Sequence, residues 1–132
     1  MRILSILSLG FLLHAHADTS KTIKSCYSEY VNTMSKGGEE SDLVKIRKKC
    51  LTKKFNKEWK KRVAASDSDA IVLSQDLLQS WEVALRIESI DAQNSIAKVI
   101  LGNKQEEQCL LVSYVTEGKL QRISNVQLCS NK

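Results

Sequence analysis

The chain has 132 residues, of which 42% are hydrophobic and 27% are charged, and its formal net charge is +5. This length suits one domain and is too short for two domains of ordinary size. The hydrophobic content argues against an intrinsically disordered chain, and the absence of proline excludes proline-rich linkers.

The first seventeen residues have the pattern of an export signal. Arg2 supplies a positive start, residues 3–13 are mostly apolar, and Ala15-His16-Ala17 matches a signal peptidase site. The apolar run is shorter than the ~20 residues that span a bilayer. We expect a signal peptide at 1–17, cleaved after Ala17, and a single domain at 18–132 that is soluble in the periplasm or secreted. A buried N-terminal helix is the alternative.

Cleavage would have a chemical consequence. The two histidines, His14 and His16, leave with the signal, so the mature chain has no imidazole for Ser-His or Cys-His catalysis or for metal binding. The chain also lacks the common nucleophile, phosphate-binding and zinc motifs. We expect no catalytic residue, no metal and no cofactor. An enzyme that uses the carboxylates of Asp67, Asp69 and Asp76 alone stays open, although such residues are more typical of turns.

Four cysteines remain in the mature chain. In an oxidising compartment an even number favours disulfides, and their spacing contains no CxxC zinc knuckle. We favour the pairs Cys26–Cys50 and Cys109–Cys129, because each joins neighbours in a plausible local unit. Each bridge closes a loop worth roughly 3–4 kcal/mol of stability in the chain-entropy model.

Helical periodicity comes first along the chain. Residues 20–35 carry an apolar stripe of one helix, which Gly37-Gly38 ends. Glu39, Glu40 and Asp42 open a second helix, and Thr52 caps a third. The three expected stripes are Ile23, Cys26, Tyr27, Tyr30, Val31 and Met34; Leu43, Ile46, Cys50 and Leu51; and Phe55, Trp59 and Val63.

Strand patterns follow the helices. Residues 66–69 form a loop and 71–80 an extended entry, and from Trp81 the hydrophobic period becomes two, which places Trp81, Val83, Leu85 and Ile87 on one face. Further strands are expected at 95–101, 108–116 and 119–128, the last two as a hairpin with a bulge or a longer loop. The order predicts an α+β domain, with N-terminal helices packed on one face of a curled four-stranded antiparallel sheet.

Short motifs within this pattern resemble a family of small exported bacterial proteins known as the domain-of-unknown-function 3828 family. The matching residues are Tyr30-Val31, Lys49-Cys50-Leu51-Thr52-Lys53-Lys54-Phe55, Asp67-Ser68-Asp69, Ser74-Gln75-Asp76, Ser80-Trp81, Thr116-Glu117-Gly118-Lys119 and Ile123-Ser124-Asn125-Val126. Asn125 departs from the family, where Asp is common. The resemblance implies a cystatin-like or nuclear-transport-factor-like fold and no established activity. By analogy, small exported proteins of this kind include immunity proteins against type VI secretion toxins.

The charge is polarised along the chain. Residues 45–62 contain ten basic residues and one acidic residue, Glu58, for a net charge of +9, whereas the rest of the mature chain carries −5. Such a patch attracts anionic partners. The alternative is that these residues form only the solvated faces of two helices, and the sequence supports this equally well. Nucleic acid is disfavoured because no stacking aromatics interleave with the lysines. Anionic envelope lipid stays open as a transient contact, without a stable membrane anchor.

These observations favour a binding protein. We expect a periplasmic inhibitor or immunity protein that occludes the active site of a toxin or cell-wall hydrolase with an acidic surface, and a homodimer is a further option. The expected partner-binding residues are Lys45, Lys48, Lys49, Lys53, Lys57, Lys60, Lys61, Arg62, Asp67, Asp69, Glu106 and Glu107. The alternative is a small-ligand module with a pocket inside the curled sheet, lined by Trp81, Val83 and Tyr114.

Overall fold

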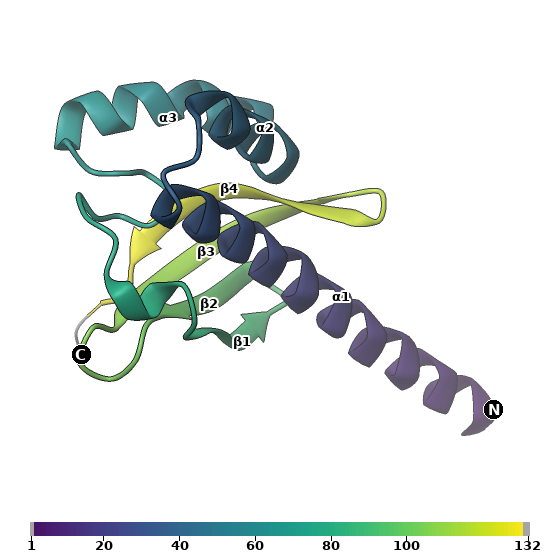
Figure 1. Cartoon of the computed structure of the whole chain (residues 1–132). Coiled ribbons are helices and arrows are strands. Elements are labelled where there is room, and N and C mark those ends of the chain that lie inside the picture. The colour runs from purple at the N-terminus through teal and green to yellow at the C-terminus, as the bar shows by residue number, and fades with distance from the viewer. Residues whose placement is uncertain (1, 131–132) are drawn as a thin grey trace.

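A computed structural model describes the backbone of residues 2–130 and the side chains of residues 18–130. Three helices, α1 (Arg2–Ser35), α2 (Glu40–Cys50) and α3 (Lys53–Ser66), precede four strands, β1 (Leu85–Asp91), β2 (Ile96–Leu101), β3 (Gln108–Glu117) and β4 (Leu120–Leu128). The strands form one antiparallel sheet in the order β1-β2-β3-β4. The helices cover one face of this sheet, which is not closed (Figure 1). The predicted α+β architecture is confirmed.

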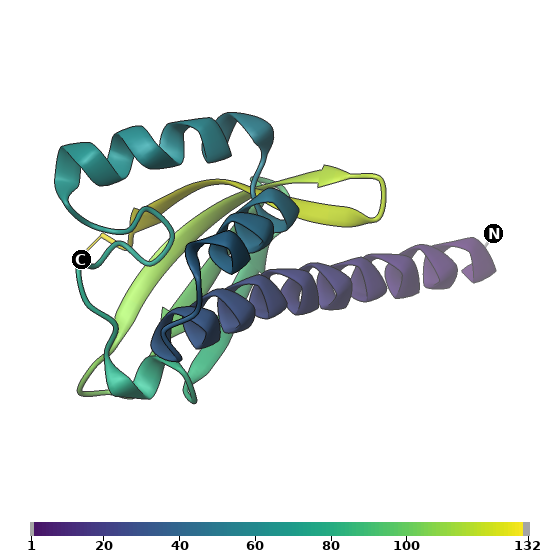
Figure 2. The ribbon, with the colours of Figure 1, turned by 45° about the horizontal axis from the view of Figure 1, so that its top comes forward.

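Helix α1 crosses the covered face of the sheet, and its N-terminal part extends beyond the sheet in both views (Figures 1 and 2). The side chains of the expected signal peptide lie outside the described residues. The predicted stripe is buried from Ile23 to Val31 and partly buried at Met34, with Tyr27 and Tyr30 no more than 1% exposed. The helix ends where expected, because Gly37 adopts a φ of +68° and the Gly38 amide donates to the Thr33 carbonyl.

Helices α2 and α3 meet at a sharp corner made by Leu51 and Thr52. The Thr52 hydroxyl accepts a hydrogen bond from the Phe55 amide at 3.1 Å, which confirms the predicted cap of α3. The Thr52 amide donates to the carbonyl of Ile123 at 2.9 Å, so the corner pairs with the outer edge of β4. The backbone therefore fixes both helices to the edge strand of the sheet.

The β3–β4 hairpin contains the predicted irregularity. Gly118 and Lys119 make a two-residue turn between Glu117 and Leu120, and the register shifts by one residue between Ser113 and Tyr114. Since Tyr114 pairs with Ile123 and Ser113 with Asn125, Ser124 is the extra residue of a β-bulge.

Both favoured disulfides are present. Cys26–Cys50 joins α1 to α2 with a Cα–Cα distance of 5.9 Å, and Cys109–Cys129 joins β3 to the residue after β4 with a Cα–Cα distance of 5.4 Å. Two disulfides are typical of proteins that fold outside the reducing cytoplasm.

Across the described part of the chain, none of the helices combines the length and the apolar character that a bilayer crossing requires.

The prediction that a strand starts at Trp81 is wrong. Trp81 ends a short 3₁₀ helix (Gln79–Trp81), and β1 begins only at Leu85. The Trp81 indole donates to the Glu106 carbonyl at 2.7 Å, and this contact with a distant loop holds the segment out of the sheet. Val83 is consequently 85% exposed rather than on the inner face.

Candidate functional site

A hollow of about 800 Å³ lies where the α2–α3 corner meets the turn end of the β3–β4 hairpin. We call it the basic groove, because five of its nine lining residues are cationic and one is acidic. Its walls come from two segments that are far apart in the sequence, residues 48–57 of α2 and α3 and residues 117–122 of the β3–β4 hairpin. Helix α3 lies along β4 in Figure 2. The lining residues are Lys48, Leu51, Thr52, Lys53, Lys54, Asn56, Lys57, Glu117 and Arg122.

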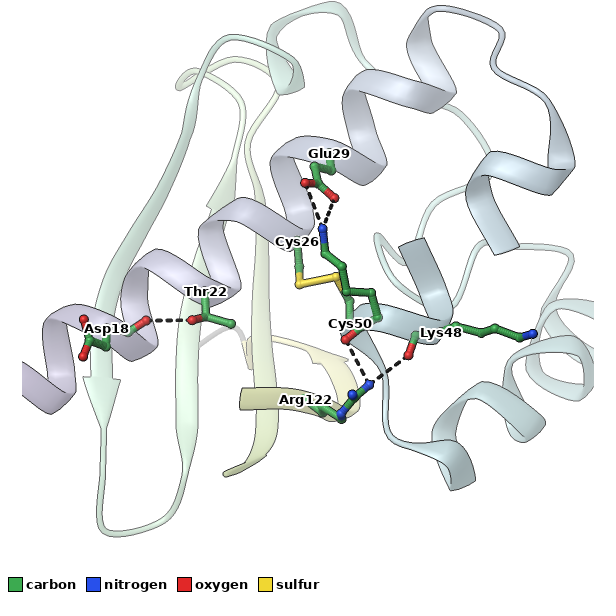
Figure 3. The surroundings of a disulfide bond; sticks show 8 residues. Asp18, Thr22, Cys26, Glu29, Lys48, Cys50 and Arg122 are labelled. Carbon is green, nitrogen blue, oxygen red and sulfur yellow. Dashed lines mark hydrogen bonds and ion pairs between the residues drawn. A yellow bond between two sulfur atoms is a disulfide. The ribbon is translucent and has the colours of Figure 1, made fainter. Parts of the chain in front are cut away.

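Arg122 positions the walls of the basic groove. Its Nη1 donates to the carbonyls of Lys48 and Lys49 at 2.8 and 3.0 Å, and its Nε lies 3.0 Å from an oxygen of Glu117. Figure 3 shows the side chain reaching from β4 to the end of α2, beside the Cys26–Cys50 disulfide. The guanidinium binds the last carbonyls of α2, which favour a cation. The contacts of Nη1 hold the hairpin against the end of α2.

Unlike Arg122, the four lysines of the basic groove have no ion-pair partner within residues 18–130. Lys48, Lys53, Lys54 and Lys57 are all exposed. Lys53 and Lys54 occupy the first turn of α3, which contains no acidic residue. The partial positive charge of a helix N-terminus disfavours cations there, so an anion in the groove would relieve this repulsion.

Among the basic residues of the 45–62 span, Arg47 differs in that its side chain is buried. Its side chain is only 3% exposed, it lies 2.6 Å from an oxygen of Glu40, and its guanidinium carbon is 3.9 Å from the centroid of the Trp59 ring. Within the described residues its Nη1 has no hydrogen-bond partner. Arg47 therefore packs α2 onto α3 and contributes little to the charged surface.

Two basic members of the predicted binding set, Lys49 and Arg62, have structural partners. Lys49 forms an ion pair with Glu29 on α1 at 2.9 Å. Arg62 donates to the Asn125 side chain at 2.9 Å and to the Val126 carbonyl at 3.0 Å, which attaches α3 to β4. By contrast Lys45, Lys60 and Lys61 are exposed, away from the walls of the basic groove.

The predicted acidic residues do not join the basic groove. Asp67 is the left-handed cap at the end of α3, with a φ of +56°. Asp69 accepts hydrogen bonds from the Tyr30 hydroxyl and from the amides of Ile71 and Val72, so it organises the buried end of the loop. Burial, followed by the nearby Asp69 charge, raises the pKa of Tyr30 far above its usual value.

The other two predicted acidic residues lie in the loop before β3. A carboxylate oxygen of Glu106 accepts a hydrogen bond from the Ser80 amide at 2.9 Å, and hydrogen bonding to Ser80 lowers the pKa of Glu106. Glu107 lies 3.6 Å from Arg86 of β1. These contacts fix the loop that holds Trp81, which gives both residues a local structural role.

The pocket lining proposed inside the curled sheet is not formed. Trp81 and Tyr114 are 2% and 6% exposed, whereas Val83 is 85% exposed and cannot line a cavity with them. A void of about 10 Å³ does lie between α1, α2 and β4, beside Tyr27 and Arg47. That volume is close to the minimum for one water molecule.

Sequence reasoning placed Lys48, Lys53 and Lys57 in the binding set, and Lys54 only in the basic run of residues 45–62. It missed Arg122, Glu117 and Asn56 as wall residues. Arg122 and Glu117 belong to a hairpin whose local pattern predicts only a strand and a turn. Nothing in that pattern indicates that the hairpin passes beside the α2–α3 corner.

Comparison with known proteins gives a fold and no activity. No family model and no curated protein matches the chain, so the resemblance to the domain-of-unknown-function 3828 family stays a prediction. The chain is similar to a protein of unknown function from Bacteroides thetaiotaomicron, known from a crystal structure. The TM-score is 0.79 at 19% sequence identity, over 93% of this chain and 98% of that one. The likeness establishes that the helix-then-sheet fold occurs in a second protein.

Proposed function

We propose that this chain is an exported binding protein that acts as an inhibitor or immunity protein. It neutralises a toxin or cell-wall hydrolase, such as a type VI secretion effector, by covering the acidic active-site cleft of that enzyme. It works by binding and performs no catalysis of its own. The observation that carries the proposal is the basic groove, with four lysines that have no ion pair in the described part of the chain.

The chemistry of the expected target supports this assignment. Most glycoside hydrolases cleave their polymers with a pair of Asp or Glu side chains, so their clefts are acidic. A surface of opposite charge speeds the encounter with such a cleft and fixes the orientation of the complex. The groove lysines are exposed, which leaves them available to a partner.

Two features support an exported location for this chain. The sequence pattern of residues 1–17 is that of a signal peptide, and two disulfides fit an oxidising space. We place the mature chain in the periplasm, where a wall-degrading toxin would act.

The test is protection of living cells. A strain that lacks the gene is expected to be killed by toxin-bearing neighbours, and the wild-type chain should restore survival. The K54E/K57E variant should fail to restore it, because two groove cations become anions. The K21E/K24E variant is the matched control, since it reverses two exposed lysines with the same spacing on α1. Equal survival with and without the gene would refute the proposal.

A further inference from the structure

The cations of α3 form a straight row along one face of the helix. Lys53, Lys57 and Lys60 are spaced by four and three residues, so they share a face, and all three are exposed. At a rise of 1.5 Å per residue, the successive lysines lie about 6 and about 4.5 Å apart along the axis. The opposite face carries Phe55, which is buried in the core.

A second hollow continues the basic groove along this row. It has a volume of about 380 Å³ and shares Asn56 and Lys57 with the basic groove. Lys60 and Trp59 lie on its wall, together with the inward-facing Arg47. The two hollows therefore form one concave path that runs from the hairpin past the first half of α3.

Resting on the proposed function, we infer that this path binds an extended acidic segment of the partner polypeptide, with carboxylates at alternate positions. In a strand, side chains on one face repeat about every 6.6 Å, which is close to the spacing of Lys53 and Lys57. The charges are complementary over the whole row, and the lysines of the row have no ion pair within residues 18–130.

The polarity of the path also limits how the segment can bind. Glu117 stands at the hairpin end of the basic groove and pairs with Arg122 at 3.0 Å, so this end offers an incoming carboxylate less attraction than the unpaired lysines of the row. The acidic positions of the segment are therefore expected over Lys53, Lys57 and Lys60 rather than beside the hairpin.

Two synthetic peptides of equal composition test the inference. In one, four Asp residues alternate with three Thr residues, and in the other the four Asp residues are consecutive; both have blocked ends. Binding to the ¹⁵N-labelled mature protein is followed by NMR. The Trp59 indole N–H should shift because it lines the path, and the Trp81 indole N–H, bonded to the Glu106 carbonyl, should not.

The expected affinities rank the two peptides and the variants. The alternating peptide should bind at least about threefold more tightly than the clustered one. Only in the alternating peptide do all four carboxylates lie on one face of an extended strand, with a repeat close to the Lys53–Lys57 spacing. The K57E/K60E variant should bind it about tenfold more weakly, whereas K21E/K24E should remain within about twofold of wild type. Raising the salt concentration should weaken binding throughout.

Equal affinity for the two peptides would overturn the inference, as would binding to anionic phosphatidylglycerol vesicles without binding to either peptide. Failure here is distinguishable from failure of the proposed function. If the alternating peptide binds the row but the gene protects no cell, the proposed function is wrong and the inference stands. If the gene protects cells, K54E/K57E fails to protect them and K57E/K60E protects them fully, the inference is wrong and the proposed function stands.

Discussion

Helix α2 has three lysines and helix α3 has five, and the two helices differ in which end carries basic residues. Helix α2 has Glu40 and Asp42 in its first turn and Arg47, Lys48 and Lys49 in its last turn, which suits its dipole. Helix α3 has no acidic residue in its first turn and no basic residue in its last turn. The basic residues in the last turn of α2 therefore stabilise their own helix, whereas Lys53 and Lys54 destabilise the N-terminus of α3. Charge that opposes local stability is a better indicator of a binding surface than charge that supports it.

The largest expected effect comes from separating α2 from α1. Replacing Cys26 and Cys50 by Ser should lower the free energy of unfolding by about 3–4 kcal/mol, since the bridge closes a loop of more than twenty residues. Urea denaturation measures this loss. Helix α3 should also lose its place over the sheet, because the α2–α3 corner directly follows Cys50. An unfolding free energy equal to that of the wild type would contradict the structural role given to this bridge.

The next largest effect is expected from removing the contact between α2 and α3. Arg47→Ala should destabilise the fold by about 2–3 kcal/mol, because a buried side chain that stacks on Trp59 is removed. The measurement is again denaturant unfolding, with Lys45→Ala on the exposed face of α2 as a control that should change stability little. If the two variants were equally stable, Arg47 would belong to the surface after all.

Loss of the cap at the start of α3 should have a smaller effect. Thr52→Ala removes the acceptor for the Phe55 amide and should cost about 1 kcal/mol. Thr52→Ser retains the hydroxyl and should stay close to wild type. Thermal unfolding of both variants checks the prediction, and a Ser variant as unstable as the Ala variant would show that the methyl group matters more than the cap.

The smallest effects test the comparison directly. Lys53→Glu should stabilise the protein and Lys48→Glu should destabilise it, each by about 0.3–1 kcal/mol at low ionic strength, because the two charges lie at opposite helix ends. Both differences should shrink in high salt. Thermal unfolding at two salt concentrations measures them. Changes of the same sign would mean that net charge, rather than the helix dipoles, controls these positions.

Local features of the fold were predictable because their signals are short in range. The stripe on α1, the Thr52 cap and the bulge in the β3–β4 hairpin each follow from periodicity or spacing within about twenty residues. The disulfides belong with them, since each joins segments that are close in the chain. The lysines of the basic groove were found in the same way, as a run of charge.

The sequence by itself therefore determined the three helices, the antiparallel sheet, the disulfide pairs and the polarity of charge. Only the tertiary structure decided that Arg47 is buried, that Asp69 bonds to Tyr30, and that Val83 is exposed because a loop captures Trp81. It also brought Arg122 to the carbonyl of Lys48, 74 residues away, and so completed the wall of the basic groove. The physical reason is that a long polar side chain takes its partner from whichever element packs beside it, and no periodicity along the chain records that choice.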